Sequence, residues 1–281
     1  MAGLTWFDGE WIDDKAPMIS VNSQGVWLSS FIFDGARAFE GVMPDLDLHC
    51  ARAIRSANNL GLKATKSMEE IMELAWEGVG KFSSDTALYI RPMFWAEEGW
   101  VAPDPETTRF ALTVTENPMP GDGGFSACIS TRRRPMPDAA PTDTKSAGLY
   151  PNAGRALTEA RGKGFDNAVV LDPIGNVAEF ATANLFMVKD GMVRTPAVNG
   201  TFLNGVTRQR VIKLFHENGV EVQEGRVTTD DLLEADEIFN TGNWGKVMHV
   251  NRFEGRDLQP GPMYQRAREM YWEYSHKHGH R

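Results

Sequence analysis

A lysine among small residues is the first candidate for chemistry in this sequence. Lys145 lies in "TDTKSAGLYPNAGRA", where Thr, Ser, Ala and Gly surround it and a helix is predicted to follow. Short side chains let a flat ligand approach, and a lysine amine can bond to a carbonyl carbon as a Schiff base. A charge solvated in a loop would show the same pattern, so Lys145 by itself leaves both interpretations open.

Two other segments contain groups that such a ligand would need. Glu179 stands at the end of a predicted strand in "GNVAEFATANLF", and small residues follow it. A Gly-Val-Thr sequence opens a predicted helix in "LNGVTRQRVI", where exposed N–H groups and the helix dipole favour an anion such as phosphate. A Schiff-base amine, a carboxylate for a pyridinium nitrogen and a phosphate seat are the requirements of pyridoxal 5′-phosphate. The sequence therefore predicts this cofactor.

The elements that must position these groups mix hairpins with single helices. Turn signals at Asp8-Gly9, Pro173 to Gly175 and Asp190-Gly191 each predict a hairpin. Caps and helical periodicity predict helices over 46–60, 67–80, 152–163, 207–219 with Thr207 as the cap, and from 262 onward. Strands and helices do not alternate regularly. We therefore predict an α+β fold with mostly antiparallel sheets.

The densest break in the chain predicts a domain boundary. Residues 117–124, "NPMPGDGG", combine Pro with Gly and are predicted to be an interdomain linker. Residues 1–116 would form a small N-terminal α/β domain, and residues 125–281 a larger C-terminal cofactor-binding domain with flanking helices. A chain of 281 residues has room for two domains, because one domain usually has roughly 100–150.

Composition and charge argue against several classes of partner. The sequence has 29 Lys and Arg against 38 Asp and Glu, a net charge of -9, which repels nucleic acid and anionic membrane surfaces. Two cysteines are too few for a disulfide scaffold and fit a reducing compartment. The acidic N-terminus does not resemble a signal peptide, and no apolar run reaches the roughly 18 residues of a membrane span. We expect a cytoplasmic protein with no nucleic-acid or membrane partner.

Motifs for other chemistries are absent from the sequence. It contains no G-x-G-x-x-G after a strand, no G-x-x-x-x-G-K-[ST], no H-E-x-x-H and no G-x-S-x-G. The histidine-rich ending "HKHGHR" has no carboxylate or cysteine beside it, so a polar tail is expected there and no metal site.

Several segments, taken in order, resemble the signature blocks of the class IV (fold type IV) pyridoxal phosphate aminotransferases, and most closely the branched-chain amino acid aminotransferases. The second half of the chain carries "KSAGLYPN", "NVAEFATANLFMVKDG", "LNGVTRQRVI" and "LLEADEIFNTGN". The first half carries "FDGARAFEGV", "HCARAIRSANNLGL" and "YIRPMFW", which are similar to the small domain of that family. The resemblance covers nearly the whole chain. It implies transamination between an amino acid, of the branched-chain type, and a 2-oxo acid such as 2-oxoglutarate.

The resemblance also implies roles for residues around the cofactor. Lys145 would form the Schiff base and shuttle the proton between substrate and cofactor, and Glu179 would keep the pyridine nitrogen protonated. Tyr150 would hydrogen-bond the phenolic oxygen of the cofactor. The phosphate would be bound by Arg52 and by the residues at the two predicted phosphate loops, which are Val206, Thr207, Gly242 and Asn243. For each residue an ordinary structural role is the alternative.

The substrate side rests on fewer matches. Phe39, Tyr89 and Arg91 match residues that line the substrate pocket of the branched-chain type, with sheet packing as the alternative. The usual Gly-Thr-Ala loop appears here as Gly242-Asn243-Trp244, and Trp244 would change the volume beside the substrate carboxylate.

Further departures leave alternative activities open. Asp34 stands where the branched-chain enzymes often carry a pocket tyrosine. The run 132–134 of arginines could bind a second carboxylate or be solvated. A D-amino acid aminotransferase, an (R)-amine transaminase, an aminodeoxychorismate lyase and a noncatalytic cofactor-binding protein therefore remain alternatives. Family members form active sites at subunit boundaries, which implies a homodimer or a multiple of it.

Overall fold

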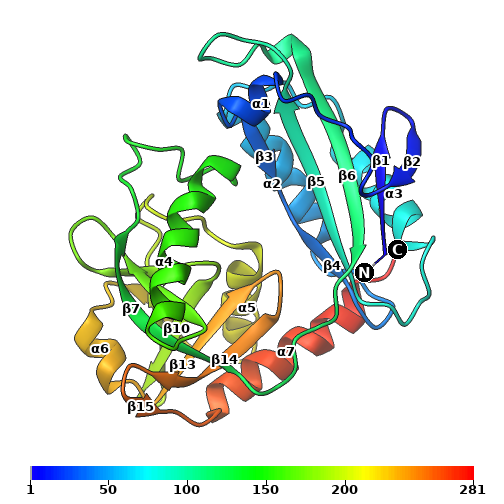
Figure 1. Ribbon diagram of the computed structural model, residues 1–281. Coiled ribbons are helices and arrows are strands. Elements are labelled where there is room, and N and C mark those ends of the chain that lie inside the picture. The colour runs from blue at the N-terminus through cyan, green and yellow to red at the C-terminus, as the bar shows by residue number, and fades with distance from the viewer. Residues whose placement is uncertain (1) are drawn as a thin grey trace. The chain divides into compact units, whose positions relative to one another are not determined.

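The computed structural model describes residues 2–281 and divides into two compact units (Figure 1). Unit 1 consists of residues up to Met119, Thr144–Leu149 and Tyr274–Arg281. Unit 2 consists of Pro120–Asp143 and Tyr150–Glu273. Two short segments beyond the predicted linker therefore belong to unit 1, because their contacts are with its helices and strands. One of these segments contains Lys145.

Unit 1 is built on a six-stranded antiparallel sheet. The strand order is β2-β1-β6-β5-β3, and β4 also pairs with β5. Its strands are β1 (Gly3–Phe7), β2 (Glu10–Asp13), β3 (Phe31–Phe33), β4 (Ala36–Ala38), β5 (Leu88–Ala96) and β6 (Thr108–Glu116). Its other elements are α1 (Gln24–Trp27), α2 (Leu46–Asn59), α3 (Met68–Val79), η1 (Pro105–Thr107) and η2 (Ala147–Leu149).

One face of this sheet forms the core of unit 1. Alternate residues of β5, including Leu88, Ile90 and Phe94, pack with Ala53 of α2 and Ile71 of α3 in one buried cluster. Helices α2 and α3 lie against this face (Figure 1). The residues between these core positions project from the other face, because side chains alternate along a strand.

Unit 2 is built on a nine-stranded mixed sheet. The order is β12-β11-β10-β13-β14-β7-β8-β9, with β15 beside β14. Parallel pairs are β11–β12, β14–β7 and β7–β8, and the other pairs are antiparallel. Its strands are β7 (Phe125–Arg133), β8 (Asn167–Leu171), β9 (Val177–Phe180), β10 (Asn184–Lys189), β11 (Met192–Pro196), β12 (Val222–Gly225), β13 (Glu237–Gly242), β14 (Lys246–Phe253) and β15 (Arg256–Asp257). Its helices are α4 (Tyr150–Gly162), α5 (Val206–Glu217), α6 (Thr229–Glu234) and α7 (Pro262–His278), whose last residues belong to unit 1.

Local sequence signals explain where several elements begin and turn. Ser67 and Glu70 form both bonds of the predicted capping box at α3, which ties the helix start to its own side chains. The prediction that Thr207 caps a helix is wrong, because Gly205 is the N-cap of α5 and Thr207 is already helical. Within residues 2–281, no side chain caps the N–H groups in the first turn of α5.

No helix within residues 2–281 is long and apolar enough to cross a membrane.

Candidate active site

Lys145 is fixed by its backbone in unit 1. Its N–H donates to the Ser56 hydroxyl on α2 (3.2 Å), and its carbonyl accepts from the N–H of Phe33 on β3 (3.2 Å). The ammonium nitrogen lies 5.1 Å from the centre of the Phe33 ring. Lys145 is half-buried. These contacts hold the lysine between a helix and a strand, so it is not a solvated loop charge.

Arg52 lies one helical turn from Ser56 on α2 and forms a two-point ion pair with Asp34. Its Nε donates to Oδ2 of Asp34 (2.6 Å) and its Nη2 donates to Oδ1 (2.8 Å). Nδ1 of His49 lies 2.8 Å from the same Oδ1. Burial would raise the pKa of Asp34, but the charge and hydrogen bonds of Arg52, together with His49, lower it well below its usual range. Asp34 is therefore ionised, and its oxygens orient Arg52.

Glu179 on β9 is held by two neighbours in unit 2. Its Oε1 lies 3.4 Å from Nε of Arg134, and its Oε2 accepts from Nδ2 of Asn184 (3.2 Å). The side chains of Arg134 and Glu179 are only 11% and 12% exposed, so this arginine of the 132–134 run is not a solvated charge. The ion pair and the amide bond hold the carboxylate that is predicted to face the cofactor nitrogen.

Asn184 joins that carboxylate to the start of α5. Its Oδ1 accepts from the N–H of Gly205 (3.0 Å), while its Nδ2 also donates to the Leu203 carbonyl (3.0 Å). A Cβ at Gly205 would lie 2.2 Å from Oδ1 of Asn184, so only glycine permits this approach. Val206 and Thr207 follow as the first two helical residues. Their position fits an anion seat formed by helix N–H groups and a hydroxyl.

The end of β13 places further polar atoms near this helix start. Thr241 pairs directly with Asn184 across the β10–β13 ladder, so their side chains share one face of the sheet. The Thr241 hydroxyl and Nδ2 of Asn243 are buried and have no hydrogen-bond partner within residues 2–281. Such atoms normally find partners in folded proteins, so they indicate a polar ligand. Gly242 lies between them on the chain.

Lys246 determines which way Asn243 points. Its Nζ donates to Oδ1 of Asn243 (2.9 Å), and its side chain is fully buried. An ammonium group can only donate, so the amide oxygen faces Lys246 and Nδ2 remains as a donor for a ligand. Trp244, the next residue in this turn, is 53% exposed. Donors at 206–207, 241 and 243 are the chemistry that a phosphate group requires, so the residues present fit pyridoxal phosphate.

The predicted substrate residues of unit 1 lie on β5 and directly after β4. Tyr89 and Arg91 are half-buried and project from the face opposite the core, with the Arg91 guanidinium 5.9 Å from the Tyr89 ring centre. Nε of Arg91 lies 3.4 Å from the hydroxyl of Thr113. Phe39 is buried. Tyr150 begins α4 in unit 2 and is 41% exposed.

Four of the residues above were not identified as site residues from the sequence, namely His49, Asn184, Thr241 and Lys246. Asp34 was predicted only as a departure in the pocket, and Arg134 only as one of three arginines in a run. A polar amide within the apolar run "ANLFMV" is the signal that could have identified Asn184, because an amide in a buried strand must be hydrogen-bonded. The other residues carry no such local signal.

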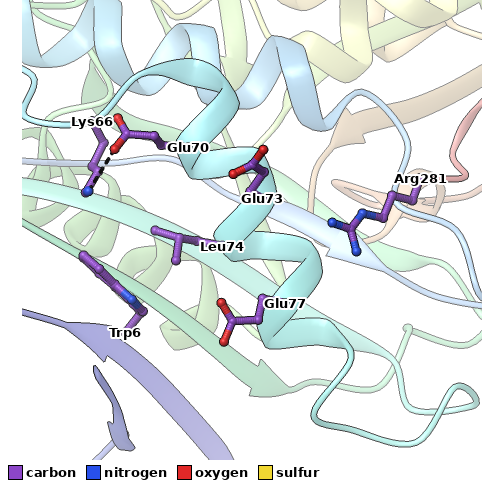
Figure 2. Close-up of a pocket in the computed structure, with 7 residues that line it drawn as sticks. All are labelled: Trp6, Lys66, Glu70, Glu73, Leu74, Glu77 and Arg281. Carbon is purple, nitrogen blue, oxygen red and sulfur yellow. Dashed lines mark hydrogen bonds and ion pairs between the residues drawn. The ribbon is translucent and has the colours of Figure 1, made fainter. Parts of the chain in front are cut away.

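A surface hollow of about 410 Å³ lies elsewhere in unit 1 (Figure 2). Its lining combines Trp6, Lys66 and Arg281 with three glutamates of α3. None of the predicted site residues lines it. Within residues 2–281, no group of three or more His, Cys, Asp or Glu side chains is placed to hold a metal ion.

Comparison with known proteins identifies the family. The model for "Amino-transferase class IV" matches residues 31–253. An aminotransferase from Brucella abortus, crystallised with the cofactor PLP, is 51% identical; the match covers 98% of this chain and 100% of that one, with a TM-score of 0.97. A probable branched-chain-amino-acid aminotransferase of Rickettsia felis is 32% identical over 89% of this chain and 86% of its own. This chain belongs to the class IV aminotransferases.

Another related structure bears on the substrate. The branched-chain aminotransferase of the thermophilic archaeon Thermoproteus uzoniensis, crystallised with norvaline, is 28% identical. The match covers 99% of this chain and 96% of that one, with a TM-score of 0.90. Family membership confirms the predicted α+β fold class, the predicted enzyme class of a pyridoxal-phosphate-dependent aminotransferase, and the predicted cofactor.

Proposed function

We propose that this enzyme transfers the amino group of a branched-chain amino acid to a 2-oxo acid such as 2-oxoglutarate. The names of the Rickettsia felis and Thermoproteus uzoniensis relatives support the branched-chain donor. The single observation that carries the proposal is the bridge formed by Asn184, which connects the carboxylate of Glu179 to the anion seat at Gly205. One amide thereby fixes both a group suited to a ring nitrogen and a group suited to a phosphate.

Pyridoxal phosphate supplies an electron-withdrawing ring that stabilises negative charge on the substrate Cα. Nζ of Lys145 would hold the cofactor through its amine and would move the proton at the substrate Cα. The carboxylate of Glu179, ion-paired with Arg134, keeps a proton on the ring nitrogen. A positioned acid–base group such as this lysine typically contributes about 10²–10⁴-fold to the rate.

The phosphate is assigned to donors whose positions are fixed by the protein. Val206 and Thr207 offer N–H groups and a hydroxyl at the start of α5, and Gly242 and Asn243 offer an N–H and an amide. Arg52 adds a positive charge, since Asp34 leaves the arginine anchored but does not remove its charge. Tyr150 is assigned to the phenolic oxygen of the cofactor.

Phe39, Tyr89, Arg91 and Trp244 are assigned to the substrate. Trp244 is a bulky, half-exposed ring in place of the small residue usual in this family, so it would restrict the volume beside the substrate carboxylate. D-amino acid and (R)-amine transamination, and aminodeoxychorismate cleavage, are the alternatives on this same fold. We also propose a homodimer or a multiple of it, and a cytoplasmic location.

The proposal is tested by trapping the lysine bond and by measuring half-reactions. Borohydride reduction of the loaded protein should attach the cofactor to the peptide that contains Lys145, and label on another peptide would refute the assignment. Lys145→Ala should still bind cofactor but leave both half-reactions near background. A donor panel of L-leucine, L-glutamate, D-alanine and (R)-1-phenylethylamine, followed by cofactor absorption, decides among the alternatives. Analytical ultracentrifugation tests the dimer.

A further inference from the structure

Arg37 is a buried arginine that meets no carboxylate within residues 2–281. It lies in β4 with its side chain fully buried, and its Nη2 donates to the Asn117 carbonyl (2.6 Å) and contacts Sδ of Met119 (2.9 Å). Its Nε and Nη1 have no hydrogen-bond partner in that same range. Two of the three guanidinium nitrogens are therefore hydrogen-bond donors without an acceptor in the described part of the chain.

This arrangement is costly unless another molecule completes it. Burial lowers the pKa of Arg37 to about 10, with Tyr89 opposing the shift, so the guanidinium is still charged at neutral pH. A buried charge without a partner destabilises a fold, and proteins normally pair or remove such groups. A group that costs stability and is nevertheless fixed in position is characteristic of a binding site.

The surroundings of Arg37 suit an anion. Arg37 pairs directly with Tyr89 across the β4–β5 ladder, and Arg91 follows two residues later on the same face. Their chain neighbours Ala36 and Ile90 belong to the core on the opposite face. Two guanidinium groups therefore flank one phenol ring on the outer face of the sheet. Tyr89 and Arg91 are half-buried beside the fully buried Arg37, so a ligand that contacts these two side chains would lie next to its guanidinium group.

We propose that Arg37 binds a carboxylate group of the amino-acid or 2-oxo-acid substrate. A planar guanidinium with unpaired N–H groups matches a carboxylate in shape and charge. The carboxylate can come from two sources, which are the α-carboxylate of every substrate and the second carboxylate of a dicarboxylic substrate such as L-glutamate. This inference rests on the proposed function.

The test compares Arg37→Met with Arg109→Met as the matched control. Arg109 lies on the same sheet face, but its side chain is 40% exposed and is paired with Asp8. Arg37→Met should raise KM about tenfold or more, because it removes roughly one charge-assisted hydrogen bond to the substrate. Arg109→Met should leave KM unchanged. A higher KM for both L-leucine and L-glutamate identifies the α-carboxylate as the group that Arg37 binds. A higher KM for L-glutamate alone identifies the second carboxylate of the dicarboxylic substrate. Unchanged KM for both overturns the proposal.

A second measurement does not depend on turnover. Calorimetric titration of the loaded protein with 4-methylvalerate and with glutarate should give weaker binding of at least one in Arg37→Met. The unfolding temperature of this variant should be equal to or above that of the wild type, because an unpaired buried charge is removed. A lower unfolding temperature with unchanged carboxylate binding would show that Arg37 only anchors 117–119.

Two outcomes separate this inference from the proposed function. If the wild type transaminates but Arg37→Met binds both carboxylates normally, the site is refuted and the function stands. If no donor reacts but carboxylate binding still depends on Arg37, the function is refuted and the site stands. Should Arg37→Met fail to fold, Arg37→Lys keeps the charge without the planar fork and should show the same loss of carboxylate affinity.

Discussion

Asp34 binds Arg52 through both of its carboxylate oxygens, with 2.6 Å to Nε and 2.8 Å to Nη2. The two groups are buried in unit 1, where His49 also contacts the carboxylate. Asp34, at the position where branched-chain enzymes often have a pocket tyrosine, therefore forms an ion pair here. It holds the arginine assigned to the cofactor phosphate.

Replacing Asp34 by Asn should weaken both stability and cofactor binding. The amide keeps the shape but removes the negative charge that both Arg52 bonds use, so the free energy of unfolding should fall by about 3–5 kcal/mol. Denaturant titration and a pyridoxal phosphate titration measure the two effects. Asp47→Asn, at an exposed position in the first turn of α2, is the control and should cost about 1 kcal/mol or less. Equal losses in the two variants would contradict the role of Asp34.

Replacing Glu179 by Gln should slow catalysis but preserve cofactor binding. The neutral amide cannot hold the ring nitrogen in its charged form, and the loss of one such electrostatic contact typically costs about 10²–10³-fold in kcat. The bond between Asn184 and Gly205 does not involve Glu179, so the phosphate seat should remain. Rapid-mixing half-reactions measure the rate. Glu224→Gln, which alters an ion pair with Arg208 in the same unit, should leave that rate unchanged.

Replacing Lys246 by Met should lower cofactor affinity without destabilising the apoprotein. Without the ammonium group, the Asn243 amide is no longer fixed with Nδ2 as the free donor. We expect the Kd for pyridoxal phosphate to rise about tenfold, equivalent to one hydrogen bond of about 1.4 kcal/mol. Fluorescence titration measures this Kd. The control is Lys213→Met, because the Lys213 side chain is 62% exposed on α5. An unchanged Kd in Lys246→Met would refute the orienting role.

Glu159 should make unit 2 sensitive to acid. Burial would raise the pKa of Glu159, but hydrogen bonds from Lys163, Ser130 and Thr131 outweigh it and lower the pKa from its ordinary value of 4.5 to about 2. Because the folded pKa is depressed, the stabilisation is complete above about pH 4.5 and is lost as the pH falls toward about 2.

The measurement is the free energy of unfolding against pH for the wild type and Glu159→Gln. The wild type should be more stable by about 1.5–3 kcal/mol at pH 6, and the two curves should converge near pH 2. Glu73→Gln, at an exposed position on α3, is the control, and it should change the free energy of unfolding at pH 6 by less than about 0.5 kcal/mol. A difference that is independent of pH would exclude titration of Glu159 as its cause.

Local chemistry explains which parts of the fold could be predicted from the sequence. Asp8-Gly9 and Asp190-Gly191 form the predicted turns, and all four residues have the positive φ angles that these pairs adopt readily. The capping box of Ser67 and Glu70 involves only neighbouring residues, so its pattern is visible in the sequence. Predictions of this kind depend on a few residues and the geometry of one turn.

Contacts between distant segments explain what could not be predicted. Asp34 and Arg52 belong to different elements, and the Lys145 backbone reaches Ser56 on α2, so no periodicity reveals either contact. Gly205, and not Thr207, is the N-cap of α5, and its N–H donates to Asn184 on β10, a contact that the local sequence does not show. The roles of individual residues in the site came from the resemblance and stay predictions, whereas the family itself is established.

The strand order of unit 2 has a consequence for how the protein is made. Strand β7 lies between β8 and β14, and β14 ends at Phe253, so the middle of this sheet stays open until most of the chain exists. Unit 1 can be completed only later still, because the Met43 N–H donates to the carbonyl of Gly279. A ribosome adding about 5–20 residues per second therefore exposes unpaired strand edges for many seconds. Nascent chains of this enzyme should depend on chaperones until the segment that contains Gly279 has been synthesised.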